Sequence, residues 1–161
     1  MSRGEVQSNL SVAADADGSS DFWQGPWDVQ ALPSLMQAID AWAMSRKWGD
    51  LFLFQVRLIA EELVVNVMTH AQPRQDQLRS SGWVRVEVFD QAAPWRIVIS
   101  DNAQTFDPTA QESPDLHAGL DERAVGGLGV HLAMKMCDRL VHQALPQGNR
   151  LTAFKHPPDA S

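Results

Sequence analysis

The segment from Asp50 to His70 constrains the fold most, because the helix that it predicts carries two different stripes of side chains. The apolar stripe repeats every three or four residues, as in a helix with one face in a protein core. It comprises Phe52, Val56, Ile59, Leu63 and Val67. The polar stripe beside it comprises Glu62, Asn66 and His70, which share a helical face because they are four residues apart. A buried Asn66 amide would need partners, so this stripe predicts either a polar site or a solvated helix edge.

Two weaker elements precede this helix. Residues Phe22–Val29 predict an edge strand, and a further helix is expected from Pro33 to about Lys47, with the proline at a position near the helix start that it tolerates. Asp50 is the expected N-cap of the central helix.

The second half of the chain predicts two hairpins. Trp83–Phe89 alternates between valine and polar side chains, and Trp95–Ser100 follows after a short turn, so an antiparallel pair is expected. A helix over Leu128–Cys137 then leads to strands at Arg139–Leu145 and Leu151–Lys155, joined by a turn at 146–149. This order predicts an α+β two-layer sandwich, with helices packed on one face of a mixed, mainly antiparallel sheet.

Length and charge exclude several classes of protein. The 161 residues predict a single domain over residues 22–156, with tails at 1–21 (expected to be disordered) and 157–161. The net charge of -7 and the absence of a basic run argue against direct nucleic-acid binding. The chain has no apolar run of about 20 residues and no signal-peptide pattern, so no membrane segment is expected and the cytoplasm is the expected compartment. The single cysteine, Cys137, cannot form an intrachain disulfide and is interpreted as core filler rather than a reactive thiol.

Three local patterns carry possible chemistry. In Glu62-x-x-x-Asn66 a carboxylate that can deprotonate a hydroxyl lies one turn from an amide oxygen that can complete a Mg²⁺ shell. Asp101 follows an apolar strand, where its carboxylate can accept a hydrogen bond from the amine of adenine or start an ordinary turn. The stretch 126–129, Gly-Gly-Leu-Gly, opens a helix, so it can cradle phosphate or act as a hinge.

In this order and spacing the three patterns resemble the N, G1 and G2 boxes of the GHKL, or Bergerat-fold, ATPases, the class that includes gyrase B, Hsp90, histidine kinases and the MutL repair proteins. From about Leu32 to Lys155 the chain looks more narrowly like the bacterial anti-sigma-factor serine kinases of the partner-switching type. The matching stretches are Glu-Glu-Leu-Val-Val-Asn at 61–66, His70-Ala71, Ser-Asp-Asn at 100–102, Phe-Asp-Pro at 106–108, 122–129 and Asn-Arg-Leu-Thr at 149–152.

The resemblance implies a role for each matching residue. Glu62 would be the catalytic base and Asn66 the Mg²⁺ ligand, while Asp101 would bind adenine with support from Thr152. The remaining residues expected to contact the nucleotide are Ala103, Arg123, Gly126, Gly127, Leu128 and Gly129. Arg123, in the segment expected to form a lid, would reach either the phosphates or a partner protein. His70 matches a histidine of the family but receives no role.

The implied cofactors are ATP and Mg²⁺. The implied partners are a small STAS-domain antagonist, phosphorylated on serine or threonine, and a sigma factor that the protein sequesters; homodimer formation is left open.

One departure keeps a second hypothesis open. The class shows Asp-x-Gly-x-Gly at the G1 box, whereas this chain has Ala103 and Thr105 in place of the two glycines. An alanine held at positive φ would cost about 1 kcal/mol. The alternative to an active kinase is therefore a non-catalytic Bergerat-fold module that only captures partners. Retention of Glu62 favours the kinase, because a pure binding module needs no base there.

Overall fold

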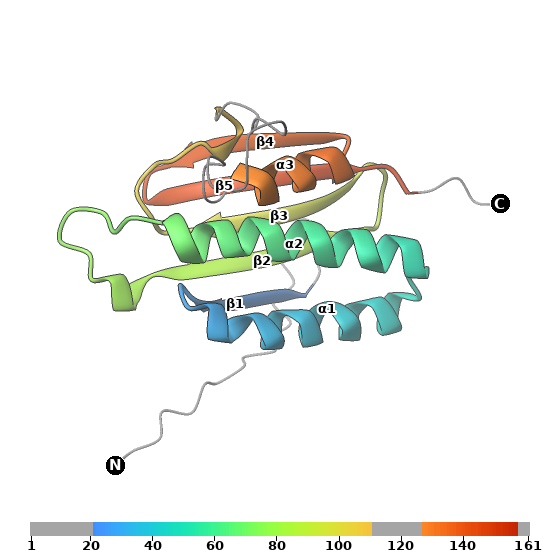
Figure 1. Cartoon of the computed structure of the whole chain (residues 1–161). Helices are drawn as coiled ribbons and strands as arrows, with labels where there is room; N and C mark the ends of the chain where they lie inside the picture. The colour runs from blue at the N-terminus through green and yellow to red at the C-terminus, as the bar shows by residue number, and fades with distance from the viewer. Residues whose placement is uncertain (1–20, 111–126, 158–161) are drawn as a thin grey trace, which may run out of the picture.

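The computed structural model describes residues 21–110 and 127–157 of the chain (Figure 1). Its strands and helices are, in chain order, β1 (Phe22–Pro26), α1 (Leu32–Arg46), α2 (Asp50–His70), β2 (Trp83–Phe89), β3 (Trp95–Asp101), α3 (Gly127–Met136), β4 (Arg139–Leu145) and β5 (Gly148–Lys155). Three single 3-10 turns accompany them: η1 (Val29–Ala31), η2 (Arg79–Ser81) and η3 (Pro108–Ala110). The expected disordered tail at the N-terminus and the expected lid fall largely outside the described residues.

The five strands form one sheet in the order β1-β2-β3-β5-β4, and the three helices cover one of its faces (Figure 1). This confirms the predicted α+β sandwich. The expectation of a mixed sheet was wrong for the described strands, because all four strand pairings are antiparallel. The reason lies in the connection after β3: α3 leads to β4 at the sheet edge, and the tight turn into β5 brings the chain back antiparallel to both neighbours.

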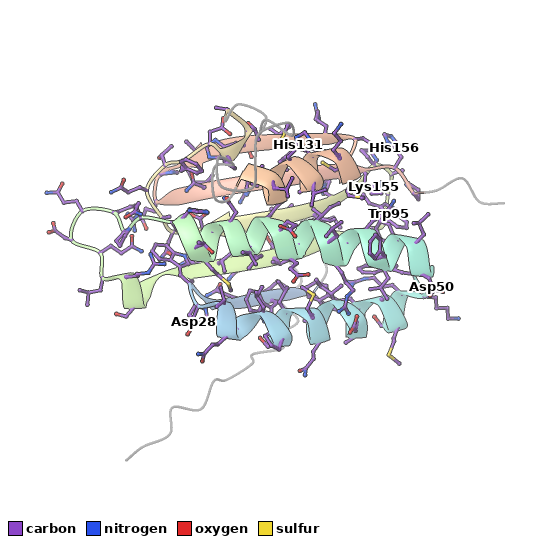
Figure 2. All side chains as sticks on the ribbon, viewed as in Figure 1. Asp28, Asp50, Trp95, His131, Lys155 and His156 are labelled. Carbon is purple, nitrogen blue, oxygen red and sulfur yellow. The ribbon has the colours of Figure 1, made fainter. Side chains whose placement is uncertain are left out.

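The core lies between α2 and the sheet. All five residues of the predicted apolar stripe on α2 are buried, and the three alternating valines of β2, Val84, Val86 and Val88, are fully buried against them. Figure 2 shows side chains filling the space between the helices and the sheet, with Trp95 labelled near the start of α2. The Trp95 ring lies edge-on to Phe52, with 3.8 Å between ring centroids. The stripe therefore fixes which face of α2 points inward and leaves Glu62, Asn66 and His70 at the edge of the core.

Cys137 is buried in this core, as predicted. Burial raises the pKa of its thiol, which disfavours the reactive thiolate. None of the described helices combines the length and the apolar character that crossing a membrane requires.

Two boundaries differ from the prediction in ways that matter for the site. The N-cap of α2 is Gly49, and Asp50 instead lies in the first turn, where a carboxylate is stabilised by the helix dipole. Strand β5 begins at Gly148 rather than Leu151, so the turn after β4 contains only residues 146 and 147. A Cβ on Gly148 would lie 1.8 Å from the carbonyl oxygen of Asp101, so the close approach of these backbones requires glycine.

Candidate functional site

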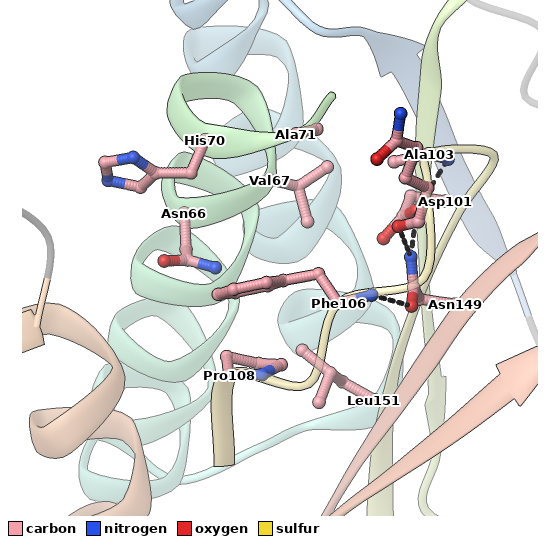
Figure 3. A pocket seen from close by; sticks show the side chains of 11 residues that line it. Asn66, Val67, His70, Ala71, Asp101, Ala103, Phe106, Pro108, Asn149 and Leu151 are labelled. Carbon is pink, nitrogen blue, oxygen red and sulfur yellow. Dashed lines mark hydrogen bonds between the residues drawn. The ribbon is translucent and has the colours of Figure 1, made fainter. Parts of the chain in front are cut away.

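A pocket opens between the C-terminal half of α2, the end of β3, the loop that follows it and the start of β5 (Figure 3). Its apolar lining consists of Val67, Ala71, Ala103, Phe106, Pro108 and Leu151, and its polar lining of Asn66, His70, Asp101, Gln104 and Asn149. Two residues of the polar stripe of α2, Asn66 and His70, thus line the same pocket as the strand-end Asp101.

Asp101 is the anionic group of this pocket. It is the last residue of β3 and is only 6% exposed. Its Oδ1 accepts hydrogen bonds from the backbone N–H of Ala103 at 2.9 Å and from the Asn149 amide at 3.0 Å. Burial raises the pKa of Asp101, although the hydrogen bonds from Asn149 and Ala103 and the nearby His142 oppose the shift. Among the described residues Oδ2 receives no hydrogen bond, so it remains an acceptor for a ligand.

Asn149 holds Asp101 from the neighbouring strand. The two residues are directly opposite each other in the pairing of β3 with β5, and Asn149 is only 4% exposed. Its amide nitrogen donates to Asp101 Oδ1 and to the Gln104 carbonyl at 2.9 Å. Its amide oxygen accepts from the backbone N–H of Phe106 at 3.0 Å and lies 2.9 Å from His142 Nε2. Figure 3 shows the bonds from Asn149 to Asp101 and Phe106.

Thr152, which the resemblance placed in support of Asp101, does not line the pocket. Side chains alternate between the two faces of a strand. Asn149, Leu151 and Ala153 are buried on the helix side of β5, so Thr152 points to the opposite face of the sheet and does not line the pocket. The polar side chain of β5 that bonds to Asp101 is therefore Asn149, three residues before Thr152.

The two substitutions in the G1 box do not strain the backbone. Neither Ala103 nor Thr105 has a positive φ; among the described non-glycine residues only Lys47 and Asp76 do. Ala103 is buried, lines the pocket and caps Asp101 with its N–H. The penalty of about 1 kcal/mol expected for an alanine at positive φ therefore does not arise.

Glu62 lies where α2 meets α3. It is half-buried, one helical turn before Asn66, and a Cβ on Gly129 would fall 2.2 Å from its Oε2. The glycine at 129 thus lets the first turn of α3 lie directly against this carboxylate. Burial, and then the charge of Glu61, raise the pKa of Glu62, which makes it a stronger base than an ordinary glutamate.

The structure describes only some of the other predicted site residues. Gly127 begins α3, and Leu128 beside it is 42% exposed. Arg123 and Gly126 lie outside the described residues. Asn66 and His70 are half-buried and line the pocket. In residues 21–110 and 127–157 no group of three or more His, Cys, Asp or Glu side chains is placed to hold a metal ion, so Asn66 would need a ligand's own oxygens to complete a Mg²⁺ shell.

Sequence analysis missed Asn149 and His142 as site residues. Asn149 was placed in a turn, because the stretch 146–149 has turn composition, and His142 passed as an ordinary strand residue. A signal was available: both asparagine and histidine need partners when a strand buries them. Because Asn149 lies opposite Asp101 in the pairing of β3 with β5, Asp101 is the partner that this rule indicates.

Comparison with known proteins agrees with this geometry. Residues 26–155 match the histidine kinase-like ATPase domain family. The chain is also 30% identical over 118 residues to the serine/threonine-protein kinase BtrW of Bordetella bronchiseptica, a match that covers 71% of this chain and 78% of that protein. The family is one of ATPases, which implies ATP as the ligand. With its helix-covered antiparallel sheet and a pocket between α2 and Asp101, the chain belongs to the histidine kinase-like ATPase family.

Proposed function

We propose that this protein is an ATP-dependent protein serine/threonine kinase of the partner-switching type. The observation that carries the proposal is the position of Glu62. It lies one turn from the pocket-lining Asn66, on the same face of α2, and against Gly129 at the start of α3. A protein that only captured partners would have no need of a carboxylate with a raised pKa at this point.

The described residues fit ATP. Asp101 Oδ2 offers a charged acceptor to the exocyclic amine of adenine, and the apolar wall that includes Val67, Phe106 and Leu151 suits the faces of a purine. The glycines at the start of α3 would let phosphate oxygens approach backbone N–H groups at a helix N-terminus. Asn66 supplies one amide oxygen, which suits Mg²⁺ because that ion usually keeps waters and substrate phosphates as its other ligands.

Within this arrangement ATP would supply the phosphoryl group. The protein would position that group and remove the proton of the substrate hydroxyl. Glu62 would accept the proton of the substrate hydroxyl, a task that becomes easier as the pKa of the base rises toward the working pH. Asp101 would fix the base of the nucleotide, so that the phosphates lie toward Asn66 and Gly129. Positioning of this kind contributes much of the rate in phosphoryl transfer.

The proposed substrate is a serine or threonine on a small STAS-domain antagonist, and the proposed second partner is a sigma factor. The name of the Bordetella bronchiseptica relative, a serine/threonine-protein kinase, supports a protein substrate. Transfer needs the hydroxyl within about 3–3.5 Å of the phosphorus atom, so the antagonist must dock beside Glu62 at the mouth of the pocket.

A phosphoryl-transfer assay tests the proposal. The purified protein is incubated with labelled ATP, Mg²⁺ and a candidate STAS domain, and Glu62→Gln is compared with wild type. Loss of a general base typically costs about 10²–10⁴ in rate, whereas ATP affinity should stay within a few-fold because glutamine keeps the shape. Glu87→Gln is the matched control, since Glu87 lies on the sheet face away from the helices.

The outcomes separate a kinase from a binding module. Transfer that is lost in Glu62→Gln and kept in Glu87→Gln supports the kinase. A wild type that binds ATP and its partners but transfers no phosphate, with Glu62→Gln equal to it in every binding assay, would leave partner capture as the function.

A further inference from the structure

We propose that Asn149 and His142 act as a clamp on Asp101, which makes ATP selection depend on two residues of β4 and β5 that lie outside the N, G1 and G2 boxes. The inference deepens the proposed function and rests on it. The clamp is defined here as Asp101, Asn149 and His142, joined by the hydrogen bonds described above. Asn149 and His142 would be positioning residues, because they act on the ligand through Asp101.

The orientation of the Asn149 amide follows from its partners. An amide has two N–H donors and one carbonyl acceptor. The backbone N–H of Phe106 is only a donor and the carbonyl of Gln104 only an acceptor, so they fix which end of the Asn149 amide is oxygen. The second N–H of the same nitrogen must then donate to Asp101 Oδ1. Both donors and both lone pairs of the amide are used, so Asn149 cannot turn without losing bonds.

That orientation determines the tautomer of His142. Asn149 Oδ1 can only accept, so His142 Nε2, 2.9 Å away, must carry a proton. His142 Nδ1 lies 3.8 Å from Asp107 Oδ2, too far for a hydrogen bond. The imidazole side chain is 8% exposed and thus largely buried. His142 therefore pins the oxygen end of Asn149 while its nitrogen end holds Asp101.

The clamp has two consequences for a ligand. The Asp101 carboxylate cannot rotate freely, since Oδ1 is held by Ala103 and Asn149, and Oδ2 is left as the acceptor at the pocket. Asn149 also holds the loop at Gln104 and Phe106, two residues that line the same pocket. Asn149 thus positions both the Asp101 oxygen proposed to accept from adenine and the neighbouring pocket wall.

A purely structural role for these residues is the competing explanation, because buried polar groups need partners in any fold. The two explanations differ in specificity. Loss of a structural bond would weaken ATP and GTP alike or lower stability, whereas loss of the clamp would reduce the preference for ATP over GTP. His142→Gln distinguishes them further, since the glutamine amide can still donate to Asn149, whereas His142→Leu cannot.

The experiment measures Kd for ATP and for GTP by calorimetry on the full chain, in wild type and in Asn149→Ala, His142→Leu and His142→Gln. Asn149→Ala should weaken ATP by about 10- to 100-fold, the range for loss of a hydrogen bond to a charged group, and bring its ATP/GTP ratio close to 1. His142→Leu should weaken ATP binding by about 3- to 10-fold, since it removes one hydrogen bond to Asn149, which does not itself contact the ligand. His142→Gln should restore most of the affinity.

His156→Gln is the matched control. His156 is another histidine with an aspartate partner, Asp138, but it is 68% exposed. Figure 2 labels it at the end of the molecule away from the C-terminus of α2. Its replacement should leave both Kd values unchanged.

Two measurements without ligand guard against misfolded variants. Nitrogen NMR of His142 in the wild type should show a proton on Nε2, and the Phe106 amide should exchange faster with solvent in His142→Leu than in His142→Gln. An Nε2 without a proton, or an ATP/GTP ratio unchanged in both Asn149→Ala and His142→Leu, would overturn the clamp while leaving the kinase proposal intact. A wild type that binds neither nucleotide would overturn both.

Discussion

Replacement of Asp101 by asparagine should shift the base preference of the pocket from ATP toward GTP rather than merely weaken ATP binding. In the wild type, Oδ1 accepts from Ala103 and Asn149, and both of these groups are donors. An asparagine at 101 keeps those bonds only with its carbonyl oxygen in the Oδ1 position. Its NH₂ group must then occupy the position of Oδ2 and present a donor to the pocket.

The magnitude follows from the change at that one position. ATP loses a hydrogen bond to a charged acceptor, worth about 1.5–3 kcal/mol, so its affinity should fall by about 10- to 100-fold. The six-position of guanine carries an oxygen that accepts from the new donor, a neutral bond worth about 0.5–1.5 kcal/mol. The ATP/GTP preference should therefore shift by about 2–4.5 kcal/mol, or about 30- to 2,000-fold.

Calorimetry with both nucleotides, in the wild type and in Asp101→Asn, measures this shift, and the stability of the variant checks that it is folded. Burial raises the pKa of Asp101, so the folded state binds this proton more tightly than the unfolded chain, and its contribution to stability falls as pH rises through the raised value. A neutral amide avoids that cost, so Asp101→Asn should melt no lower than wild type at pH 7. An ATP/GTP ratio equal to that of the wild type would refute direct recognition of the base by Asp101.

Three further predictions concern the metal, the catalytic base Glu62 and the glycines. Asn66→Ala should weaken binding of Mg-ATP more than binding of metal-free ATP, because it removes the proposed Mg²⁺ ligand and leaves the contacts to adenine. Equal losses by calorimetry would contradict that role. The acid limb of the pH–rate profile should have its midpoint above 4.5, the ordinary pKa of glutamate, because Glu62 must lose its proton to act and its pKa is raised; a midpoint at or below 4.5 would argue against Glu62 as the base. Gly129→Ala should displace the flexible Glu62 carboxylate and slow transfer with little loss of stability, whereas Gly148→Ala meets the Asp101 backbone oxygen and should destabilise the fold by about 1–3 kcal/mol in chemical denaturation. Equal melting of the two alanine variants would contradict this distinction.

Periodicity predicted most of the fold correctly because the core decides it. The α2 stripe and the alternating valines of β2 each bury one face, and no other register would do so. Strand direction was harder to predict, because the sequence does not show where β4 lies in the sheet. In the structure β5 lies between β3 and β4 and is antiparallel to β3, so the sheet is not mixed as expected.

Site residues marked by a local sequence pattern could be predicted. Those brought to the site only by the tertiary structure were missed. Glu62 and Asn66 follow from helical spacing, and Asp101 from its place at a strand end. Asn149 was hidden by a turn-like composition, and the alternation of β5 turned Thr152 to the wrong face. The backbone at Ala103 likewise could not be known from residue type, since an alanine is strained only where φ is positive.

A structure of the wild-type protein with Mg²⁺ and a non-hydrolysable ATP analogue tests the central claim most directly. The claim is that this pocket binds ATP through Asp101 with the phosphates toward Asn66 and Gly129. It predicts the adenine amine within about 2.7–3.2 Å of Asp101 Oδ2, the metal on the Asn66 oxygen, and the γ-phosphate nearer to Glu62 than to Asp101. An analogue bound elsewhere, or bound here with its base turned away from Asp101, would contradict the account.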